Sequence, residues 1–239
     1  MTNFESRGVA SVSPPRCKAT RVVTAICYNH LMRILVFGDS IAIGFWDREG
    51  GWVSRLRRLT DTCTLKDTGY DRTVYNLGIA GNTTRDILAR FESETKVRLG
   101  DHELVIIFAI GINDSYFVDN KQAQINEKYF TENIQKLISR AKKYAVKIVF
   151  VGLNPVDEIK VSPMAGHSDT YYRNDQIDLY NSIIRNLCER SHIYFIDIMR
   201  DFKKRDYTLL LADGAHPNSA GHKVMFELVR DFLTAKGII

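Results

Sequence analysis

Residues 104–110 read LVIIFAI, seven apolar residues in succession. A β-strand points successive side chains to opposite faces of a sheet, so a run without polar residues indicates a strand that is covered on both faces. Shorter strand candidates lie at Ile34–Phe37, Thr73–Leu77, Lys147–Gly152 and Ile193–Ile196. We therefore predict five strands in one parallel sheet.

Longer amphipathic segments separate these strands and predict crossover helices. The expected helices are Trp52–Leu59, Arg85–Leu99, Gln122–Tyr144, Asn174–Glu189 and Pro217–Ala235. Ile134, Leu137, Ile138, Ala141 and Tyr144 recur at the spacing of one buried helical stripe. Right-handed crossovers then give an α/β fold, a three-layer α/β/α sandwich. Ligands of such folds bind beyond the carboxyl ends of the strands, where we expect the chemistry.

The composition predicts a globular protein without a nucleic-acid partner. The chain has 239 residues, of which 45% are hydrophobic and 26% charged, too apolar for a disordered protein. Its formal charge is +5, but residues 1–32 contribute +3 of that. The remaining 29 basic and 27 acidic residues are too balanced to neutralise a run of phosphates.

Residues 1–32 are expected to be a leader, and residues 33–239 the folded domain. The longest apolar run of the leader, Val22–Cys27, is broken by Thr24, and no Ala-x-Ala pattern follows it. No segment reaches the ~20 apolar residues of a membrane span. We therefore expect a cytoplasmic protein without an integral membrane span. The leader is a disordered arm, a poor transit peptide or an upstream extension of a gene that starts at Met32.

A serine follows the first strand, in Gly38-Asp39-Ser40. A serine hydroxyl is a weak nucleophile unless a base takes its proton and a third group orients that base. His216 is the strongest base candidate, because Asp213 precedes it by three residues in Asp213-Gly214-Ala215-His216-Pro217. Pro217 fits the first position of the last helix. The alternative is that Asp213 and His216 only cap that helix.

Three groups could stabilise the oxyanion of an acyl-transfer intermediate. One is the backbone N–H of Ser40. Another is a glycine N–H in the turn after the second strand, from Gly78 or Gly81. The third is the side-chain amide of Asn113, in Gly111-Ile112-Asn113-Asp114.

Four blocks follow one another along the chain: Gly38-Asp39-Ser40-Ile41, Asn76 to Gly81, Gly111-Ile112-Asn113-Asp114 and Asp213-Gly214-Ala215-His216-Pro217. In this order they resemble the sequence blocks of the SGNH hydrolases, also called GDSL esterases and lipases. The resemblance covers residues 33–235. It implies a flavodoxin-like sandwich that hydrolyses esters or thioesters through an acyl-enzyme and needs no cofactor. Ser40 would be the nucleophile, His216 the base and Asp213 the orienting acid. The oxyanion donors would be Ser40, Asn113 and the glycine that closes the Asn-x-x-x-x-Gly run, which is Gly81.

The resemblance does not identify the acyl group or the alcohol of the small or lipid-like ester. Several aromatic residues near the strand ends could line an acyl pocket or simply pack: Trp46, Tyr116, Phe117, Tyr171 and Tyr172. The long irregular segment Leu153–Arg173 is either a lid or a surface insertion.

Two other classes of function stay open at this stage. A metallophosphoesterase shares Gly-Asp and Gly-x-Asn-Asp fragments, but it needs several histidines at ligand spacing, and the chain has no His-x-His or Asp-x-His pair. A non-catalytic flavodoxin-like binding module is the second alternative, because a fold alone does not imply catalysis. The α/β-hydrolase pattern Gly-x-Ser-x-Gly is absent around Ser40.

Overall fold

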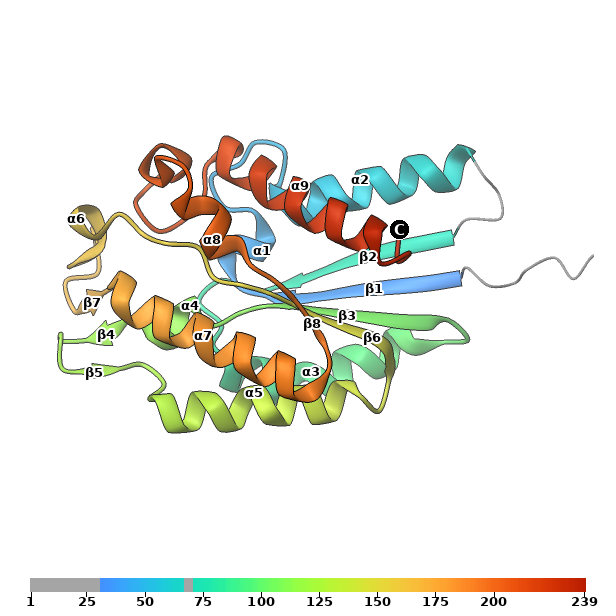
Figure 1. The fold of residues 1–239 in the computed structure, drawn as a ribbon, viewed down its shortest axis with the longest axis horizontal. Coiled ribbons are helices and arrows are strands. Elements are labelled where there is room, and N and C mark those ends of the chain that lie inside the picture. The colour runs from blue at the N-terminus through green and yellow to red at the C-terminus, as the bar shows by residue number, and fades with distance from the viewer. Residues whose placement is uncertain (1–30, 67–70) are drawn as a thin grey trace, which may run out of the picture.

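The computed structural model describes residues 31–66 and 71–239 and has a five-stranded parallel sheet at its centre (Figure 1). Its strands are β1 (Leu31–Gly38), β2 (Asp71–Gly78), β3 (Glu103–Ala109), β6 (Ala145–Val151) and β8 (Tyr194–Ile196). They lie in the order β2-β1-β3-β6-β8, and every pairing is parallel. This order is that of flavodoxin-like sheets, in which the strand order reverses beside β1.

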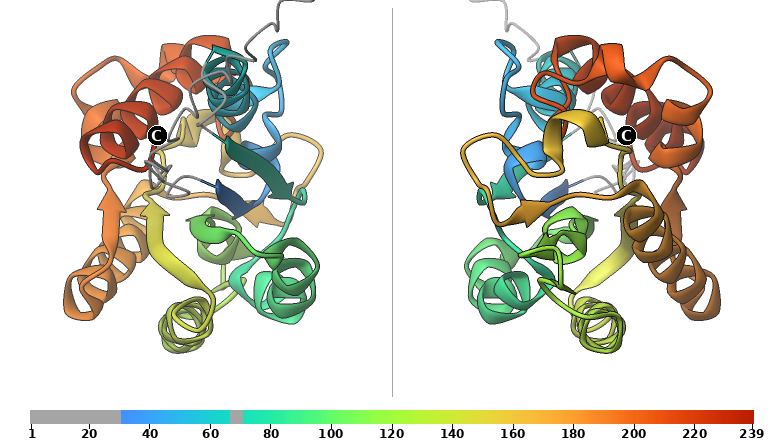
Figure 2. Two further views of the ribbon diagram at one scale, coloured as in Figure 1. Left: turned by 90° about the vertical axis from the view of Figure 1, so that its right-hand side faces the viewer. Right: turned by 90° about the vertical axis from the view of Figure 1, so that its left-hand side faces the viewer.

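Helices cover both faces of this sheet and complete the predicted sandwich. One face carries α2 (Gly51–Lys66) and α9 (Ser219–Ala235), above the sheet in Figure 1. The other carries α3 (Thr84–Leu99), α5 (Glu127–Ala141) and α7 (Asn174–Ser191). The end-on views of Figure 2 separate the two helical layers. The predicted apolar stripe is buried on α5 as far as Ala141, whereas Tyr144 lies beyond the end of the helix and is partly buried.

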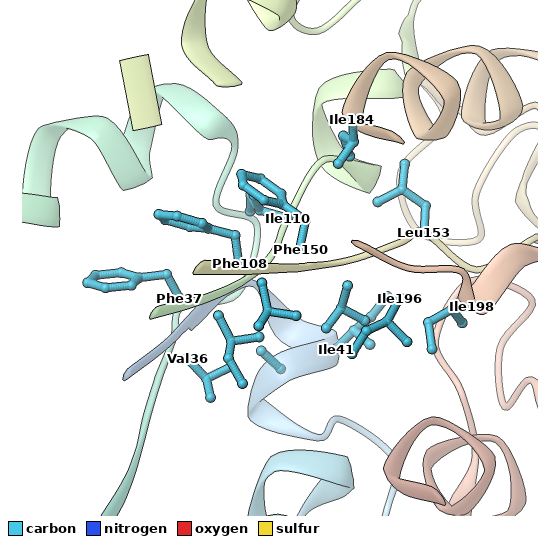
Figure 3. Packing of buried hydrophobic residues seen from close by; sticks show 14 of the residues in the cluster. Val36, Phe37, Ile41, Phe108, Ile110, Phe150, Leu153, Ile184, Ile196 and Ile198 are labelled. Atoms are coloured by element: carbon cyan, nitrogen blue, oxygen red, sulfur yellow. The ribbon is translucent and has the colours of Figure 1, made fainter. Parts of the chain in front are cut away.

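The register of the central strands builds the core. Phe37, Phe108 and Phe150 are aligned on β1, β3 and β6, with ring centroids 5.9 Å and 4.8 Å apart. Val36 precedes Phe37 and points to the opposite face, as Figure 3 shows. All four are fully buried, and burial of one such side chain contributes about 1.5–3 kcal/mol. The carboxyl ends of these strands are therefore held by packing on both faces.

Several short elements follow the strand ends. They include α1 (Ser40–Ile43), α4 (Ile112–Ser115), α6 (Glu158–Val161), α8 (Ile198–Lys203) and the 3-10 helix η1 (Tyr207–Leu210). A small antiparallel sheet joins β5 (Gln122–Ala123), β4 (Phe117–Val118) and β7 (Thr170–Tyr171). The segment Leu153–Arg173, predicted to be irregular, therefore contains α6 and β7.

Two predicted helix starts are wrong. The helix expected from Gln122 begins at Glu127, because Gln122 pairs with Val118 and the Asn126 side chain accepts a hydrogen bond from Tyr129 N. Pro217 is not the first residue of α9. Asn218 caps that helix by accepting from the N–H groups of Ala220 and Gly221, so α9 begins at Ser219.

The predicted leader, residues 1–32, overlaps the first strand by two residues. Strand β1 begins at Leu31, and Leu31 and Met32 pair with Asp71 and Arg72 of β2. The other leader residues, 1–30, lie outside the described part of the chain. Within residues 31–66 and 71–239, none of the helices combines the length and the apolar character that crossing a membrane requires.

Candidate active site

Ser40 is the first residue of α1, directly beyond the carboxyl end of β1. The Asp39 side chain caps α1 by accepting a hydrogen bond from Ile41 N at 2.9 Å. Gly38 allows this sharp turn, because a Cβ at that position would lie 2.5 Å from Ala42 Cβ and 2.8 Å from Ala109 O. The turn therefore places the serine hydroxyl over the edge of the sheet where ligands of such folds bind.

His216 and Asp213 lie beside this serine. Ser40 Oγ is 2.8 Å from His216 Nε2, across 176 residues of sequence, and His216 Nδ1 is 2.7 Å from Asp213 Oδ2. A carboxylate only accepts hydrogen bonds, so Nδ1 carries the proton in the neutral ring and Nε2 is free to accept from the serine hydroxyl. The structure thus brings together the three predicted residues in the order that serine activation needs.

Four hydrogen bonds hold the Asp213 carboxylate. Oδ1 accepts from the backbone N–H of Ala215 at 3.0 Å and of His216 at 2.8 Å. Oδ2 accepts from the Trp46 indole Nε1 at 2.8 Å as well as from His216. Partial burial opposes ionisation, but the hydrogen bonds from His216 and the backbone outweigh it and hold the pKa of Asp213 well below its usual range. Asp213 is therefore an anion that cannot easily turn away from the imidazole.

Asn113, in α4, has its amide oriented by two neighbours. Its Nδ2 donates to Asn82 O at 3.1 Å, and its Oδ1 accepts from the Tyr172 hydroxyl at 3.0 Å. Burial raises the pKa of Tyr172, so its hydroxyl keeps the proton that it donates. Because an amide nitrogen has two N–H groups, one remains for a ligand.

The two candidate glycines differ in what their surroundings permit. Gly78 N donates to Asn76 Oδ1 at 3.0 Å, and a Cβ on Gly78 would lie 2.8 Å from Asp39 O. Gly78 is therefore a packing residue whose N–H is already used. Gly81 is exposed, has a left-handed φ of +75°, and directly precedes Asn82, which contacts Asn113. Gly81 therefore stays the predicted glycine donor.

Two buried carboxyl groups, those of Asp39 and Asp114, lie next to Ser40 and Asn113 in the sequence. Asp114 accepts from Thr84 N at 3.0 Å and from Thr84 Oγ1 at 2.5 Å, which ties α4 to the start of α3. Burial raises the pKa of Asp114 to about 7 and that of Asp39 to about 6. Neither group is among the predicted catalytic residues, and no local signal indicated the contact between Asp114 and Thr84.

The segment Leu153–Arg173 contacts both the turn that carries His216 and the side chain of Asn113. Asn154 Nδ2 donates to Ala215 O at 3.1 Å, and Asp157 N donates to Gly214 O at 2.8 Å, so the segment contacts the turn that carries His216. At its other end, Tyr172 contacts Asn113. The segment therefore links the turn that bears the base to the amide of the oxyanion side.

The aromatic residues named from the sequence have different positions. Trp46 and Tyr172 contact Asp213 and Asn113, respectively. Tyr116 packs against Tyr172, with ring centroids 5.4 Å apart. Phe117 and Tyr171 pair in the small sheet instead. Sequence reasoning missed the hydrogen bonds of Trp46 and Tyr172, which join residues 167 and 59 positions apart.

In residues 31–66 and 71–239, no group of three or more His, Cys, Asp or Glu side chains is placed to hold a metal ion.

A flavodoxin-like parallel sheet that carries a serine, a histidine and an aspartate at its carboxyl edge defines a hydrolase of the SGNH class. The model of the GDSL-like lipase/acylhydrolase family matches residues 36–224, and the chain belongs to this family. It is therefore an ester-hydrolysing enzyme.

Individual relatives agree with this assignment. An acetylxylan esterase from Geobacillus stearothermophilus is 28% identical over 174 residues, which cover 69% of this chain and 72% of the relative. A solved lipase/acylhydrolase from Enterococcus faecalis has a TM-score of 0.66 at 22% identity, covering 86% of this chain and 96% of that one. A solved acetylxylan esterase from G. stearothermophilus has a TM-score of 0.65 at 21% identity, covering 84% and 92%. The two structures support the fold.

Proposed function

We propose that the protein hydrolyses carboxylic esters through a covalent acyl-enzyme on Ser40. His216 Nε2 takes the hydroxyl proton while Ser40 Oγ attacks the ester carbonyl carbon. The resulting oxyanion accepts hydrogen bonds from the N–H groups of Ser40 and Gly81 and from the free N–H of Asn113. His216 then gives its proton to the leaving alcohol oxygen as the C–O bond breaks. A water molecule repeats the sequence on the acyl-enzyme, releasing the acid and restoring the serine.

The observation that carries this proposal is the continuous chain from Ser40 to Asp213, with heavy-atom distances of 2.8 Å and 2.7 Å. These distances lie within the reach that a general base requires. Asp213 stabilises the imidazolium that forms, because its carboxylate stays ionised and held by four hydrogen bonds.

For the substrate class, we propose a short acyl ester of a carbohydrate, with O-acetyl as the preferred acyl group. The support is the likeness to relatives named as acetylxylan esterases, one of them 28% identical in sequence. Acetylated xylo-oligosaccharides are therefore the first natural-type substrates to test.

Replacement of the nucleophile tests the mechanism. Ser40→Ala should lower kcat on nitrophenyl acetate by about 10⁶, the cost of losing a serine nucleophile. The thermal unfolding of the variant should match that of the wild type, which separates loss of chemistry from loss of fold. Activity that survives in Ser40→Ala and disappears with a chelator would favour the metallophosphoesterase class instead. A wild type that binds esters without hydrolysing any would favour a binding module.

A further inference from the structure

Trp46 is the most exposed aromatic side chain in direct contact with the Ser40–His216–Asp213 group, and the catalytic chain itself does not require it. Its side chain is exposed although tryptophan is costly to leave in water, with 61% of the residue accessible. Its one polar side-chain atom, Nε1, donates a hydrogen bond to Asp213 Oδ2 at 2.8 Å. The rest of the indole is an apolar surface that faces solvent.

The backbone around Trp46 holds this surface in place. Trp46 has a left-handed φ of 64°, which is uncommon and costly for a bulky residue. On one side, Phe45 O accepts from His222 Nε2 at 3.2 Å. On the other, the buried Asp47 carboxylate binds Arg55 at 2.6 Å and accepts from Ser219 Oγ at 2.6 Å. Strained residues persist where their neighbours over-determine them, and they cluster at functional sites.

The position of the indole relative to His216 indicates which part of a substrate it meets. The two ring centroids are 6.3 Å apart, and the planes are nearly perpendicular at 84°. In the proposed reaction His216 gives its proton to the leaving alcohol, so the alcohol part of the ester must lie against the imidazole. The exposed indole beside this ring is therefore a wall of the leaving-group site rather than of the acyl site.

We propose that Trp46 is the stacking platform for the sugar ring that carries the ester; this inference rests on the proposed function. A pyranose ring has an apolar face of C–H groups and a rim of hydroxyls. Trp46 matches the apolar face, because its exposed indole is held beside the imidazole by the hydrogen bond from Nε1 to Asp213. A platform that is already ordered also lowers the entropic cost of binding.

Two variants separate stacking from the contact with Asp213. Trp46→Phe and Trp46→Leu both lose the N–H that reaches Asp213, but only the phenylalanine keeps an aromatic face. On ethyl acetate, whose alcohol is too small to stack, we expect the two variants to have equal kcat/KM within about twofold. On acetylated xylobiose, we expect Trp46→Leu to be on the order of tenfold below Trp46→Phe, mainly through a higher KM.

Fluorescence gives a second readout that needs no turnover. The chain has two tryptophans, and Trp52 is fully buried, so quenching by acrylamide reports on Trp46. In Ser40→Ala, acetylated xylobiose should protect Trp46 from the quencher, whereas ethyl acetate at the same concentration should not. Trp46→Phe, which keeps Trp52, should show no protection.

Equal Phe-to-Leu ratios for both substrates, together with no protection from quenching, would overturn the platform while leaving ester hydrolysis intact. A wild type that hydrolyses ethyl acetate but not acetylated xylobiose would overturn it too. Failure of the proposed function looks different, since Ser40→Ala would then keep its activity on both esters.

Discussion

Both the oxygen and the nitrogen of the Asn113 side-chain amide form hydrogen bonds within the protein. Its oxygen accepts from the Tyr172 hydroxyl, and one of its N–H groups reaches Asn82 O. These two hydrogen bonds fix the direction of the second N–H before any substrate binds. An oxyanion donor that is oriented in advance costs no reorganisation during the reaction.

Loss of this donor should slow the chemical step. Asn113→Ala is expected to lower kcat by about 10²–10³, the usual cost of removing one oxyanion-hole donor. Steady-state kinetics on nitrophenyl acetate measures the effect, and KM should change little because the donor acts on the intermediate. A kcat within a factor of three of the wild type would exclude Asn113 from the oxyanion hole.

Tyr172 should act on the reaction through Asn113. Tyr172→Phe removes the hydroxyl that holds Asn113 Oδ1 and leaves the ring packed, so we expect a fall in kcat of on the order of tenfold with an unchanged KM. Tyr116→Phe is the matched control, because Tyr116 packs against Tyr172 without a hydrogen bond to Asn113. The interpretation fails if the two variants lose the same activity.

At the scale of elements, the segment after α1 is fastened to two helices by Asp47. Its buried carboxylate binds Arg55 of α2, accepts from the N–H groups of Glu49 and Gly51, and accepts from Ser219 at the start of α9. The segment that carries Trp46 therefore depends on the packing of α2 against α9.

Removal of this carboxylate leaves the buried Arg55 guanidinium with the exposed Glu49 carboxylate, 3.5 Å away, as its ionic partner. Asp47→Ala should lower the free energy of unfolding by about 3–5 kcal/mol, measured by urea denaturation. Asp61→Ala is the control, since Asp61 forms an exposed pair with Arg57 at 3.3 Å and should cost at most about 1 kcal/mol. Similar decreases in the free energy of unfolding of both variants would show that the buried pair stabilises the fold no more than the exposed pair does.

The five strands could be predicted because each carries its signal locally, in a short apolar run such as residues 104–110. The start of α5 could not, because Gln122 forms β5 only through pairing with β4, which in turn pairs with β7 near residue 170. A helical pattern that extends over polar residues gives no sign of such a distant partner. The error at Pro217 has a different and local cause, because the side chain of the next residue, Asn218, makes the cap.

In the candidate site, too, the residues in local motifs could be predicted from the sequence, and the contacts between distant residues could not. Ser40, Gly81, Asn113, Asp213 and His216 stand in short motifs, so the sequence could indicate them. Trp46 and Tyr172 were candidates only for pocket lining, because their hydrogen bonds to Asp213 and Asn113 depend on the folded chain. Residue type shows that such a side chain can donate, but only the fold shows to which acceptor.

At the scale of the whole molecule, two buried carboxyl groups contribute to the dependence of stability on pH. The pKa of Asp114 is raised to about 7 and that of Asp39 to about 6, both chiefly by burial. A carboxyl of the unfolded chain has a pKa of about 3.9. The folded protein therefore binds these protons more tightly, and the stabilisation is complete below about pH 4 and lost as pH rises towards 7.

Each of these two groups should thus lower the free energy of unfolding between pH 4 and 7, by up to about 1.4 kcal/mol per pH unit, whereas the pKa of His222, lowered by burial, acts in the opposite direction. Asp114→Asn keeps an oxygen that accepts from Thr84 but cannot ionise, so the slope should become shallower by up to this amount. Asp178→Asn, at an exposed carboxylate paired with Lys203, is the control and should keep the wild-type slope. Urea denaturation across this pH range measures it, and an unchanged slope in Asp114→Asn would refute the assignment.

The most direct test of the account is to trap the nucleophile. The protein is treated with a fluorophosphonate, digested and mapped by mass spectrometry. We predict one adduct, on the peptide that contains Ser40, no adduct in Ser40→Ala, and much slower labelling in His216→Ala. An adduct on a different residue, or none from a preparation that actively hydrolyses esters, would contradict the account.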